Sequence, residues 1–261
     1  MKSYCKEKNI EVLIPADMDS SLSLSQLPRQ MKNPRVFPLA PSRRLRDLHN
    51  KWIFSNFLEK NSLPQPRTFL IAKRDDLEKL TISYPAMIKP LEMHGGEGVV
   101  RVDSKKDAYR YLSIRNKRNK LPLIIQEYVN GSGIDVSFLA YKGVILVWTV
   151  QKTLSDGGIS FVDESSVLTM ARKIVLGSSY TGIAHVDMIS EKKSNVVKIL
   201  EFNPRVWGSI LGSKFAGINF LKIGSSVQIN RLRRVQIKHK GISYISTRNF
   251  FKEFYKKQHR N

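Results

Sequence analysis

The sequence predicts an α/β or α+β fold, and two observations carry this prediction. Short apolar runs that suit strands alternate with amphipathic stretches that suit helices through most of the chain. In the second half, two pairs of apolar runs are joined by short polar turns: 135–141 with 144–152, and 182–190 with 195–203. Such pairs are typical of β-hairpins, so we expect antiparallel pairing there.

The elements of the first half follow from apolar spacing and from breaks at proline and glycine. Residues 42–61 place apolar side chains at helical intervals, and Ser42 is a suitable N-cap. The prolines in 63–67 end that helix and force an extended chain. The expected elements, in order, are strand 11–15, helix 21–31, strand 35–42, helix 42–61, strand 66–72, helix 74–80, strand 84–90, a glycine-rich loop 92–98, strand 99–102, helix 105–115 and strand 123–129.

The second half begins with a turn at Asn130–Gly133 and continues with the first hairpin, which turns at Lys142-Gly143. A helix at 163–179 separates this hairpin from the second one. A further helix is expected at 208–217. Neither an internal repeat nor a low-complexity tract is evident.

Composition allows one large domain or two modest ones, since the chain has 261 residues, of which 41% are apolar. The longest apolar stretch, 143–150, is far too short to cross a bilayer, and the N-terminal residues show no apolar segment typical of a signal peptide. Cys5 is the only cysteine, which excludes an internal disulfide and a cysteine-rich zinc site. A cytoplasmic location is therefore expected.

The charge is strongly basic, with 44 Lys+Arg against 22 Asp+Glu and a formal net charge of +22. The excess gathers in 104–120 and in the C-terminal segment 228–261. Such clusters indicate polyanionic partners such as nucleotides, nucleic acid or an anionic membrane surface. Solvated helix faces are the alternative. Residues 250–257 (FFKEFYKK) offer both apolar and cationic faces for a membrane or nucleic acid.

The stretch 199–213 (ILEFNPRVWGSILGS) interrupts an apolar run with polar groups. Glu201 and Asn203 are two apart on a strand, so they share a face, with Leu200 and Phe202 expected to pack behind them. Pairing with the preceding strand can place Asp187 opposite them. Three oxygen ligands on a rigid sheet suit Mg²⁺. A polar sheet face with a chance acidic pair is the alternative.

A lysine followed by a glycine-rich loop forms the second candidate. Lys89 ends a strand, and the N–H groups of Gly95, Gly96 and Gly98 can wrap phosphate oxygens. This is not a P-loop, because the lysine precedes the glycines and a strand follows them. An ordinary hairpin turn is the alternative.

Four motifs in this order resemble the ATP-grasp family: KP with the glycine-rich loop, QEYV with its glycine turn, a strand that carries Asp187, and EFNPR. Within that family the carboxylate–amine ligases and the ATP-binding halves of the carbamoyl-phosphate synthase large chain are most similar. The resemblance covers roughly 42–222. It implies an ATP-grasp fold, with two α+β subdomains gripping ATP between antiparallel sheets. It also implies three segments: a partial Rossmann-like segment 1–41, an ATP-grasp domain 42–227 with a lid at about 80–128, and a basic tail 228–261.

The resemblance implies roles for the nucleotide-binding residues. Lys51 and Lys89 would contact the ATP phosphates beneath a lid at Gly95, Gly96 and Gly98. Gln126, Glu127, Tyr128 and Val129 would form the hinge that meets adenine through the Glu127 carbonyl and the Val129 N–H. Gln151 and Lys152 fall where some members make further contacts. Gly133 occupies the usual position of a ribose-binding acid, so Asp135 is the expected substitute.

The resemblance also implies the reaction. Asp187, Glu201 and Asn203 would bind Mg²⁺, with Mn²⁺ as an alternative ion, and Arg205 and Lys89 would act on the transferring phosphoryl group. The implied enzyme is an ATP-dependent ligase that converts a small-molecule carboxylate into an acyl-phosphate, which an amine attacks. A carbamoyl-phosphate-synthase-like phosphoryl transfer and a nucleotide-binding module without turnover are the alternatives.

Some expectations concern completeness and individual residues. The N-terminal segment would lack strands that a protein partner or an upstream chain supplies. His185 is expected to be a hydrogen-bonded structural histidine, and Trp207 is expected to pack in the core. His94, in the lid loop, would contact phosphate or solvent.

Overall fold

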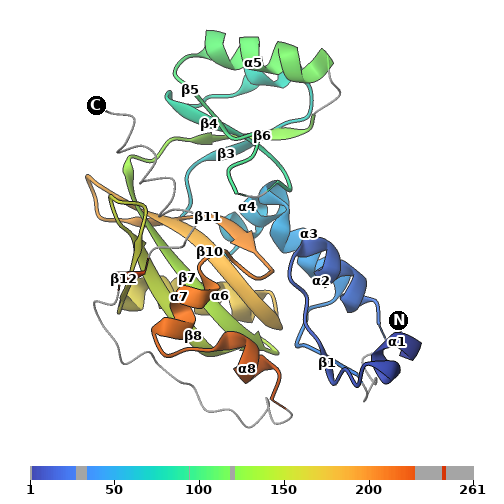
Figure 1. Ribbon diagram of the computed structural model, residues 1–261. Helices are drawn as coiled ribbons and strands as arrows, with labels where there is room; N and C mark the ends of the chain where they lie inside the picture. The colour runs from blue at the N-terminus through green and yellow to red at the C-terminus, as the bar shows by residue number, and fades with distance from the viewer. Residues whose placement is uncertain (1, 28–33, 94, 118–120, 227–242, 245–261) are drawn as a thin grey trace, which may run out of the picture.

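Two antiparallel sheets, one above the other, dominate the computed structural model, which describes residues 2–27, 34–93, 95–117, 121–226 and 243–244 (Figure 1). The small sheet has the strand order β3-β6-β4-β5, and the large sheet has the order β11-β10-β7-β8-β9-β12. The mixture of helices with antiparallel sheets confirms the predicted α+β class. The predicted segment boundaries, and with them the Rossmann-like segment, stay predictions.

The N-terminal part and the small sheet account for the first half of the chain. Their elements are α1 (Lys2–Glu7), β1 (Val12–Leu13), α2 (Met18–Ser25), β2 (Arg35–Val36), α3 (Ser42–His49), α4 (Lys51–Lys60), β3 (Thr68–Ile71), the 3₁₀ helix η1 (Arg74–Lys79), β4 (Ala86–Pro90), β5 (Val100–Val102), α5 (Lys105–Lys117) and β6 (Leu123–Glu127). Strands β1 and β2 form a separate parallel pair.

The large sheet and its helices account for the second half. Their elements are β7 (Gly131–Tyr141), β8 (Val144–Thr153), β9 (Ile159–Val162), α6 (Ser165–Gly177), β10 (Gly182–Glu191), β11 (Val197–Asn203), α7 (Ile210–Phe215), α8 (Phe220–Gly224) and β12 (Ser243–Tyr244). Both predicted hairpins, β7–β8 and β10–β11, are confirmed.

The structure corrects several predicted boundaries. The helix expected at 42–61 is two helices, because Asn50 is extended (ψ 112°) and its side chain accepts hydrogen bonds from the N–H groups of Trp52 and Ile53 at 3.1 Å each. The helix expected at 21–31 begins at Met18 behind the capping residue Asp17. Most of the expected turn at 130–133 belongs to β7, while α1 and β9 were not predicted.

Side chains alternate between the two faces of the large sheet, and each face has its own core. Even-numbered residues of β7 and β10, such as Phe138 and Val186, pack with α3, α4 and α6. Odd-numbered residues, such as Leu139 and Ile183, pack with Trp207 and with Phe220 of α8. A third core lies between the small sheet, α5 and η1. The two sheets are therefore separately packed platforms.

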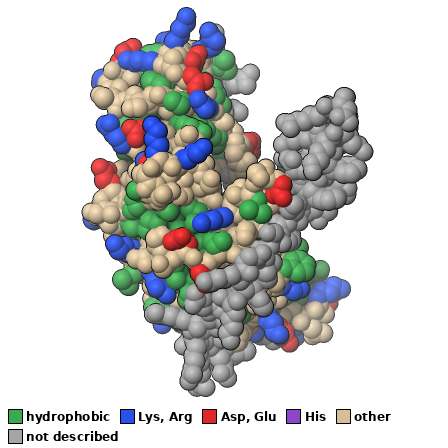
Figure 2. All heavy atoms as spheres, turned by 90° about the vertical axis from the view of Figure 1, so that its left-hand side faces the viewer, with side chains coloured by type: hydrophobic (Ala, Val, Ile, Leu, Met, Phe, Trp, Pro, Cys, Tyr) green, Lys and Arg blue, Asp and Glu red, His purple; other side chains and the backbone are tan. Residues whose placement is uncertain are grey.

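Basic and acidic side chains are interspersed over the small-sheet part of the molecule, as the face in Figure 2 shows. Lys105 pairs with Glu78 at 2.8 Å, and Arg101 pairs with Asp103 at 2.8 Å. In the described part of the 104–120 cluster, at least one lysine is thus paired with an acid. Most of the basic tail, including 250–257, and His94 lie outside the described residues. Within the described ranges, every helix is too short or too polar to cross a membrane.

Two residues on α4 give a matched test of the packing. Leu58 is 1% exposed in the core, whereas Ile53 is 44% exposed on the same helix. Leu58→Ala is expected to lower the free energy of unfolding by about 2–5 kcal/mol because it leaves a cavity. Ile53→Ala is expected to cost less than about 1 kcal/mol. Chemical denaturation of both variants measures the difference, and equal losses would contradict the assigned core.

Candidate active site

The pairing of β10 with β11 brings the three expected oxygen ligands together. Asp187 lies opposite Glu201, and His185 lies opposite Asn203. The Asn203 amide Nδ2 donates to Asp187 Oδ2 at 2.8 Å and to Glu201 Oε1 at 3.3 Å. The partially positive NH₂ group thus bridges two carboxylates, which is where a cation would be stabilised. The two carboxylates supply oxygen donors that suit Mg²⁺, so the acidic pair fits this ion, whereas the Asn203 amide oxygen accepts from Arg205 Nη2 at 3.2 Å.

A β-bulge changes which side chains flank this pair. Met188 lies opposite Ile199 while Asp187 lies opposite Glu201, so Leu200 is an extra residue on β11. Ile199 and Phe202 are buried in the core. Leu200 instead lines the same cavity as Glu201. The expectation that Leu200 packs behind Glu201 was wrong, because strict alternation does not hold across a bulge.

Lys51 connects the acidic pair to the loop that follows β4. Its Nζ lies 3.0 Å from Glu201 Oε2 and donates to the Met93 carbonyl at 2.7 Å. Its neighbour Asn50 donates to Glu92 Oε1 at 3.0 Å, and the Lys51 N–H donates to the Leu91 carbonyl at 2.9 Å. The start of α4 therefore holds the base of the glycine loop beside the carboxylates.

Lys89 is a buried cation on β4. Its Nζ donates to Gln126 Oε1 on β6 at 2.7 Å, and none of the carboxylates in the described ranges lies within 4.0 Å of it. Burial lowers the pKa of Lys89; the charges of Glu201 and Asp187 oppose this effect, and the charge of Lys51 adds to it. A buried ammonium group with so little local compensation is suited to an anionic ligand.

A cavity of about 330 Å³ opens between the two sheets beside these residues. Strands β4 and β6 of the small sheet, β10 and β11 of the large sheet, and the start of α4 all contribute walls. Its lining consists of Lys51, Met87, Lys89, Pro90, Met93, Gly96, Val99, Gln126, Glu127, Tyr128, Val129, Asp187, Ile189, Leu200 and Glu201. The four hinge candidates, both lysines and two of the three ligand candidates therefore share one cavity.

The loop above the cavity requires its glycines. Gly95, Gly96 and Gly98 have φ values of +64°, +77° and +69°, a region that side chains disfavour. A Cβ atom on Gly95 or Gly96 would meet nothing within 4 Å, so backbone conformation and not crowding sets the requirement. Of the three, only Gly96 lines the cavity.

The remaining candidates lie outside this cavity. Arg205 follows β11, and its Nη2 donates to Asn203 Oδ1 at 3.2 Å. Asp135 lies on β7, where its Oδ2 is 3.9 Å from His185 Nε2. Gln151 pairs with Asp135 and accepts from Ser209 Oγ at 3.1 Å. Lys152 lines a separate hollow of about 550 Å³. The nucleotide roles of Asp135 and Lys152 stay predictions without a contact to the cavity.

Burial and proximity shift the titration of the acidic groups. Burial raises the pKa of Glu201, and the Asp187 charge adds to this, although Lys51 opposes it. Burial also raises the pKa of Asp187, but the charge and hydrogen bond of His185, together with further hydrogen bonds, outweigh it and bring that pKa to about 2. Asp187 therefore stays ionised to lower pH, whereas Glu201 is more readily protonated.

Sequence reasoning missed part of the surroundings. His185 was expected to be structural, and the structure confirms that it is hydrogen-bonded, to Ser137 Oγ at 2.8 Å and to Asp187 Oδ1 at 2.9 Å. Ser137 was not singled out. The strand register, had it been known, would have shown both residues on the face that carries Asp187.

Residues 48–209 match the family described as the ATP-grasp domain. The chain is 24% identical over 247 residues to the C-terminal section of the carbamoyl phosphate synthase large chain of Methanopyrus kandleri, covering 87% of this chain and 45% of that protein. It is 24% identical over 243 residues to the multifunctional protein ura1 of Schizosaccharomyces pombe, covering 86% of this chain and 11% of that protein.

Solved structures agree in fold. The biotin carboxylase domain of the Hydrogenobacter thermophilus 2-oxoglutarate carboxylase, in complex with MgADP, ADP and bicarbonate, gives a TM-score of 0.71 at 13% identity over 92% of this chain and 58% of that chain. The L-amino acid ligase of Bacillus licheniformis gives 0.56 at 21% identity over 76% and 53%. This chain thus spans about half of the length of three of these proteins and a smaller share of ura1. Since the family match covers more than half of the sequence, the chain belongs to the ATP-grasp family.

Proposed function

We propose that this chain binds ATP with Mg²⁺ in the cavity between the sheets and converts a carboxylate into an acyl-phosphate, which an amine then attacks. One observation carries the proposal. The cavity combines a buried, poorly compensated lysine, a second lysine paired with Glu201, a glycine loop and the acidic pair on β10 and β11. Cations and backbone N–H groups suit the phosphates, and the acidic pair suits the metal.

The inner wall of the cavity suits a purine. Met87, Val129, Ile189 and Leu200 supply apolar surface from both sheets. Leu200 is available only because of the bulge in β11. Glu127 and Val129 offer main-chain groups at the same edge, where adenine would accept and donate hydrogen bonds. Ligand sites commonly combine apolar walls with a few polar groups in this way.

The chemistry requires positioning and charge compensation rather than a protein nucleophile. A carboxylate oxygen of the substrate forms a bond to the γ-phosphorus, the bond from that phosphorus to the β,γ-bridging oxygen breaks, and ADP leaves. The amine nitrogen then bonds to the acyl carbon, loses a proton, and phosphate leaves with the carboxylate oxygen. Lys89 and Lys51 would neutralise phosphate charge, while Arg205 would stabilise the transferred group.

Asp187, Glu201 and Asn203 would hold the Mg²⁺, which when bound offsets the negative charge of the triphosphate. Lys51 keeps Glu201 within reach of the phosphate end of the cavity. The glycine loop, held at its base by α4, would cover the phosphates and exclude water that would otherwise hydrolyse the acyl-phosphate.

A second candidate is phosphorylation of bicarbonate in a carbamoyl-phosphate-synthase-like reaction. The relatives with 24% identity include a carbamoyl phosphate synthase large chain, and a structural neighbour was solved with MgADP and bicarbonate. Since this chain spans 45% of the first of these relatives, a protein partner or further chain segments are proposed to complete the enzyme.

An ADP-release screen tests the proposed reaction. Purified chain with Mg²⁺ and ATP is expected to release ADP and phosphate faster when both a suitable carboxylate and an amine are present. Pools of carboxylates, amines and bicarbonate are supplied separately and together, with AMP and ADP quantified by chromatography. ADP stimulated by bicarbonate alone would favour the second candidate, and AMP as the nucleotide product would contradict both.

The acidic pair can be tested by one charge removal. Glu201→Gln is expected to lower the rate of ADP formation by about 100- to 1000-fold, because one ligand for the charge-compensating ion is weakened. Glu59→Gln, on the exposed face of α4, is the control and is expected to leave the rate unchanged. Circular dichroism checks folding in both. An undiminished rate in folded Glu201→Gln would refute the metal assignment.

Lys89 gives a test in which stability and binding move in opposite directions. Since burial lowers its folded-state pKa, ionised Lys89 costs stability at neutral pH, and Lys89→Met is expected to raise the melting temperature without nucleotide. Water in the cavity can replace the lost donor to Gln126. ATP affinity is expected to fall about 10- to 100-fold with the charged hydrogen bond.

The control for that test is Lys60→Met at the exposed end of α4, which should alter neither quantity. Calorimetry measures affinity, and thermal denaturation measures stability. Unchanged ATP affinity in Lys89→Met would refute the phosphate role of this lysine.

A further inference from the structure

A row of buried polar residues crosses the large sheet directly behind the acidic pair. In the strand register Thr149 lies opposite Ser137, Ser137 opposite His185, and His185 opposite Asn203. All four are less than 9% exposed. They share the sheet face that carries the apolar core around Trp207. Buried polar side chains are costly unless their hydrogen bonds are satisfied, so this row requires a physical reason.

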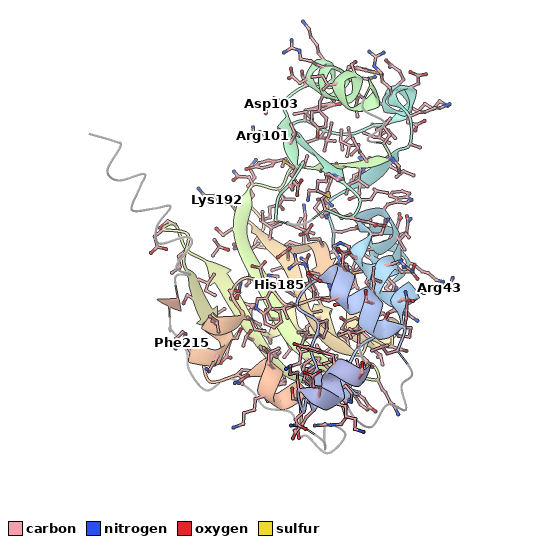
Figure 3. The ribbon with its side chains drawn as sticks, turned by 45° about the vertical axis from the view of Figure 1, so that its right-hand side comes forward. Arg43, Arg101, Asp103, His185, Lys192 and Phe215 are labelled. Carbon is pink, nitrogen blue, oxygen red and sulfur yellow. The ribbon has the colours of Figure 1, made fainter. Side chains whose placement is uncertain are left out.

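His185 is held on several sides within this row. Its Nδ1 lies 2.8 Å from Ser137 Oγ, and its Nε2 lies 2.9 Å from Asp187 Oδ1. Its ring stacks on Trp207 with centroids 5.9 Å apart and an interplanar angle of 15°. Figure 3 shows His185 inside the large sheet, while Arg43, Lys192 and Phe215 extend outward. The imidazole therefore has little freedom to rotate.

Asp135, on β7, contacts the neighbouring strand β10 next to Asp187. In the pairing of β7 with β10, Val186 lies opposite Val136 and Ile189 opposite Gly133, and the ladder is interrupted at Asp187 and Met188 between them. Asp135 Oδ1 accepts the hydrogen bond of the Met188 N–H at 3.1 Å. The carboxylate thus satisfies a backbone donor at the bulge that positions Asp187 and Glu201.

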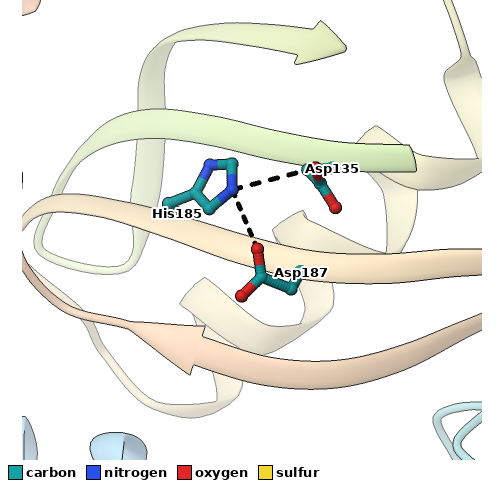
Figure 4. Close-up of side chains that lie close together, drawn as sticks. All are labelled: Asp135, His185 and Asp187. Carbon is teal, nitrogen blue, oxygen red and sulfur yellow. Dashed lines mark ion pairs between the residues drawn. The ribbon is translucent and has the colours of Figure 1, made fainter. Parts of the chain in front are cut away.

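The two oxygens of Asp187 consequently have different partners. His185 Nε2 contacts Oδ1, whereas Oδ2 accepts a hydrogen bond from the Asn203 amide, which also donates to Glu201. Figure 4 shows the imidazole between Asp135 and Asp187. A donor fixed on Oδ1 sets the plane of the carboxylate and leaves Oδ2 directed at the position proposed for the cation.

We infer that Ser137, His185 and Asp135 form a support layer that positions Asp187 as a ligand for the divalent cation. This inference rests on the proposed function. Ser137 fixes the imidazole, the imidazole fixes Asp187, and Asp135 fixes the bulge. Hydrogen-bond partners of metal ligands commonly contribute about 10- to 100-fold in metal affinity or activity. His185 is a positioning residue here, acting through Asp187.

A direct metal site at the same three residues is the competing arrangement. One ligand atom each from Asp135, His185 and Asp187 lies within 4.8 Å of the others. The contacts favour positioning. His185 Nε2 is within hydrogen-bond distance of Asp187 but 3.9 Å from Asp135, and one oxygen of Asp135 is already occupied by the Met188 N–H. The experiment below distinguishes the two arrangements.

Mn²⁺ binding in the presence of ADP tests the support layer without turnover. Free Mn²⁺ is titrated by electron paramagnetic resonance against the full chain. Ser137→Ala is expected to weaken Mn²⁺ binding about 10-fold and His185→Leu by up to about 100-fold. His185→Gln keeps a donor and is expected to recover part of the loss. Thr149→Val is the matched control, because Thr149 belongs to the same row but contacts Ser213 instead of His185.

Two further readouts separate the outcomes. ADP affinity in the presence of a chelator is expected to be equal in wild type and Ser137→Ala. Ser137→Ala is a small substitution, so it keeps the test available if His185→Leu does not fold. Pulsed resonance of bound Mn²⁺ is expected to show no directly coordinated ¹⁴N. Wild-type affinity in folded Ser137→Ala and His185→Gln, or a coordinated nitrogen that is lost in His185→Gln, would overturn the inference. Absence of Mn²⁺ binding to wild type with ADP would overturn the proposed function itself.

Discussion

The structure is organised around two partly exposed carboxylates that lie side by side in the large sheet. Asp187 and Glu201 are opposite each other on β10 and β11. Two like charges this close together repel, and they repel more strongly where protein replaces part of the surrounding water. Three groups offset these charges: His185, on the same strand as Asp187; Lys51 of α4, beside Glu201; and the Asn203 amide of β11, which contacts both. The fold stores an arrangement that a divalent cation would stabilise further.

The small sheet and the large sheet are connected beside Asp187 and Glu201. Lys51 reaches Glu201 on the large sheet and the Met93 carbonyl beyond the small sheet, and Asn50 both caps α4 and binds Glu92. Since the cavity has walls from both sheets, a ligand there contacts both platforms at once. The sheets supply rigid positions for the charged groups, while the glycine loop supplies a backbone that can follow phosphate oxygens. Rigid and adaptable parts therefore meet at the end of the cavity where we propose that the triphosphate binds.

Much of this was predictable because side-chain alternation on strands is a strong constraint. The spacing of Glu201 and Asn203, with Asp187 on the preceding strand, was sufficient to predict that all three meet, and the structure places them within hydrogen-bond distance of Asn203. The helix break at Asn50 was not predicted, since the apolar spacing continues across it and only the side-chain cap reveals it. Leu200 was misplaced because a bulge depends on the pairing partner. The support by Ser137 and Asp135 depends on the pairing of β7 with β10, and no short turn joins these two strands to reveal their register in the sequence.

We propose that a divalent cation and the triphosphate of ATP meet at Asp187 and Glu201, with adenine against Leu200. Crystals grown with Mn²⁺ and a non-hydrolysable ATP analogue, measured at a wavelength where manganese scatters anomalously, test this most directly. We expect an anomalous peak bound to oxygens of Asp187 and Glu201, with the purine between Met87 and Leu200. An analogue bound elsewhere, or a peak remote from both carboxylates, would contradict it.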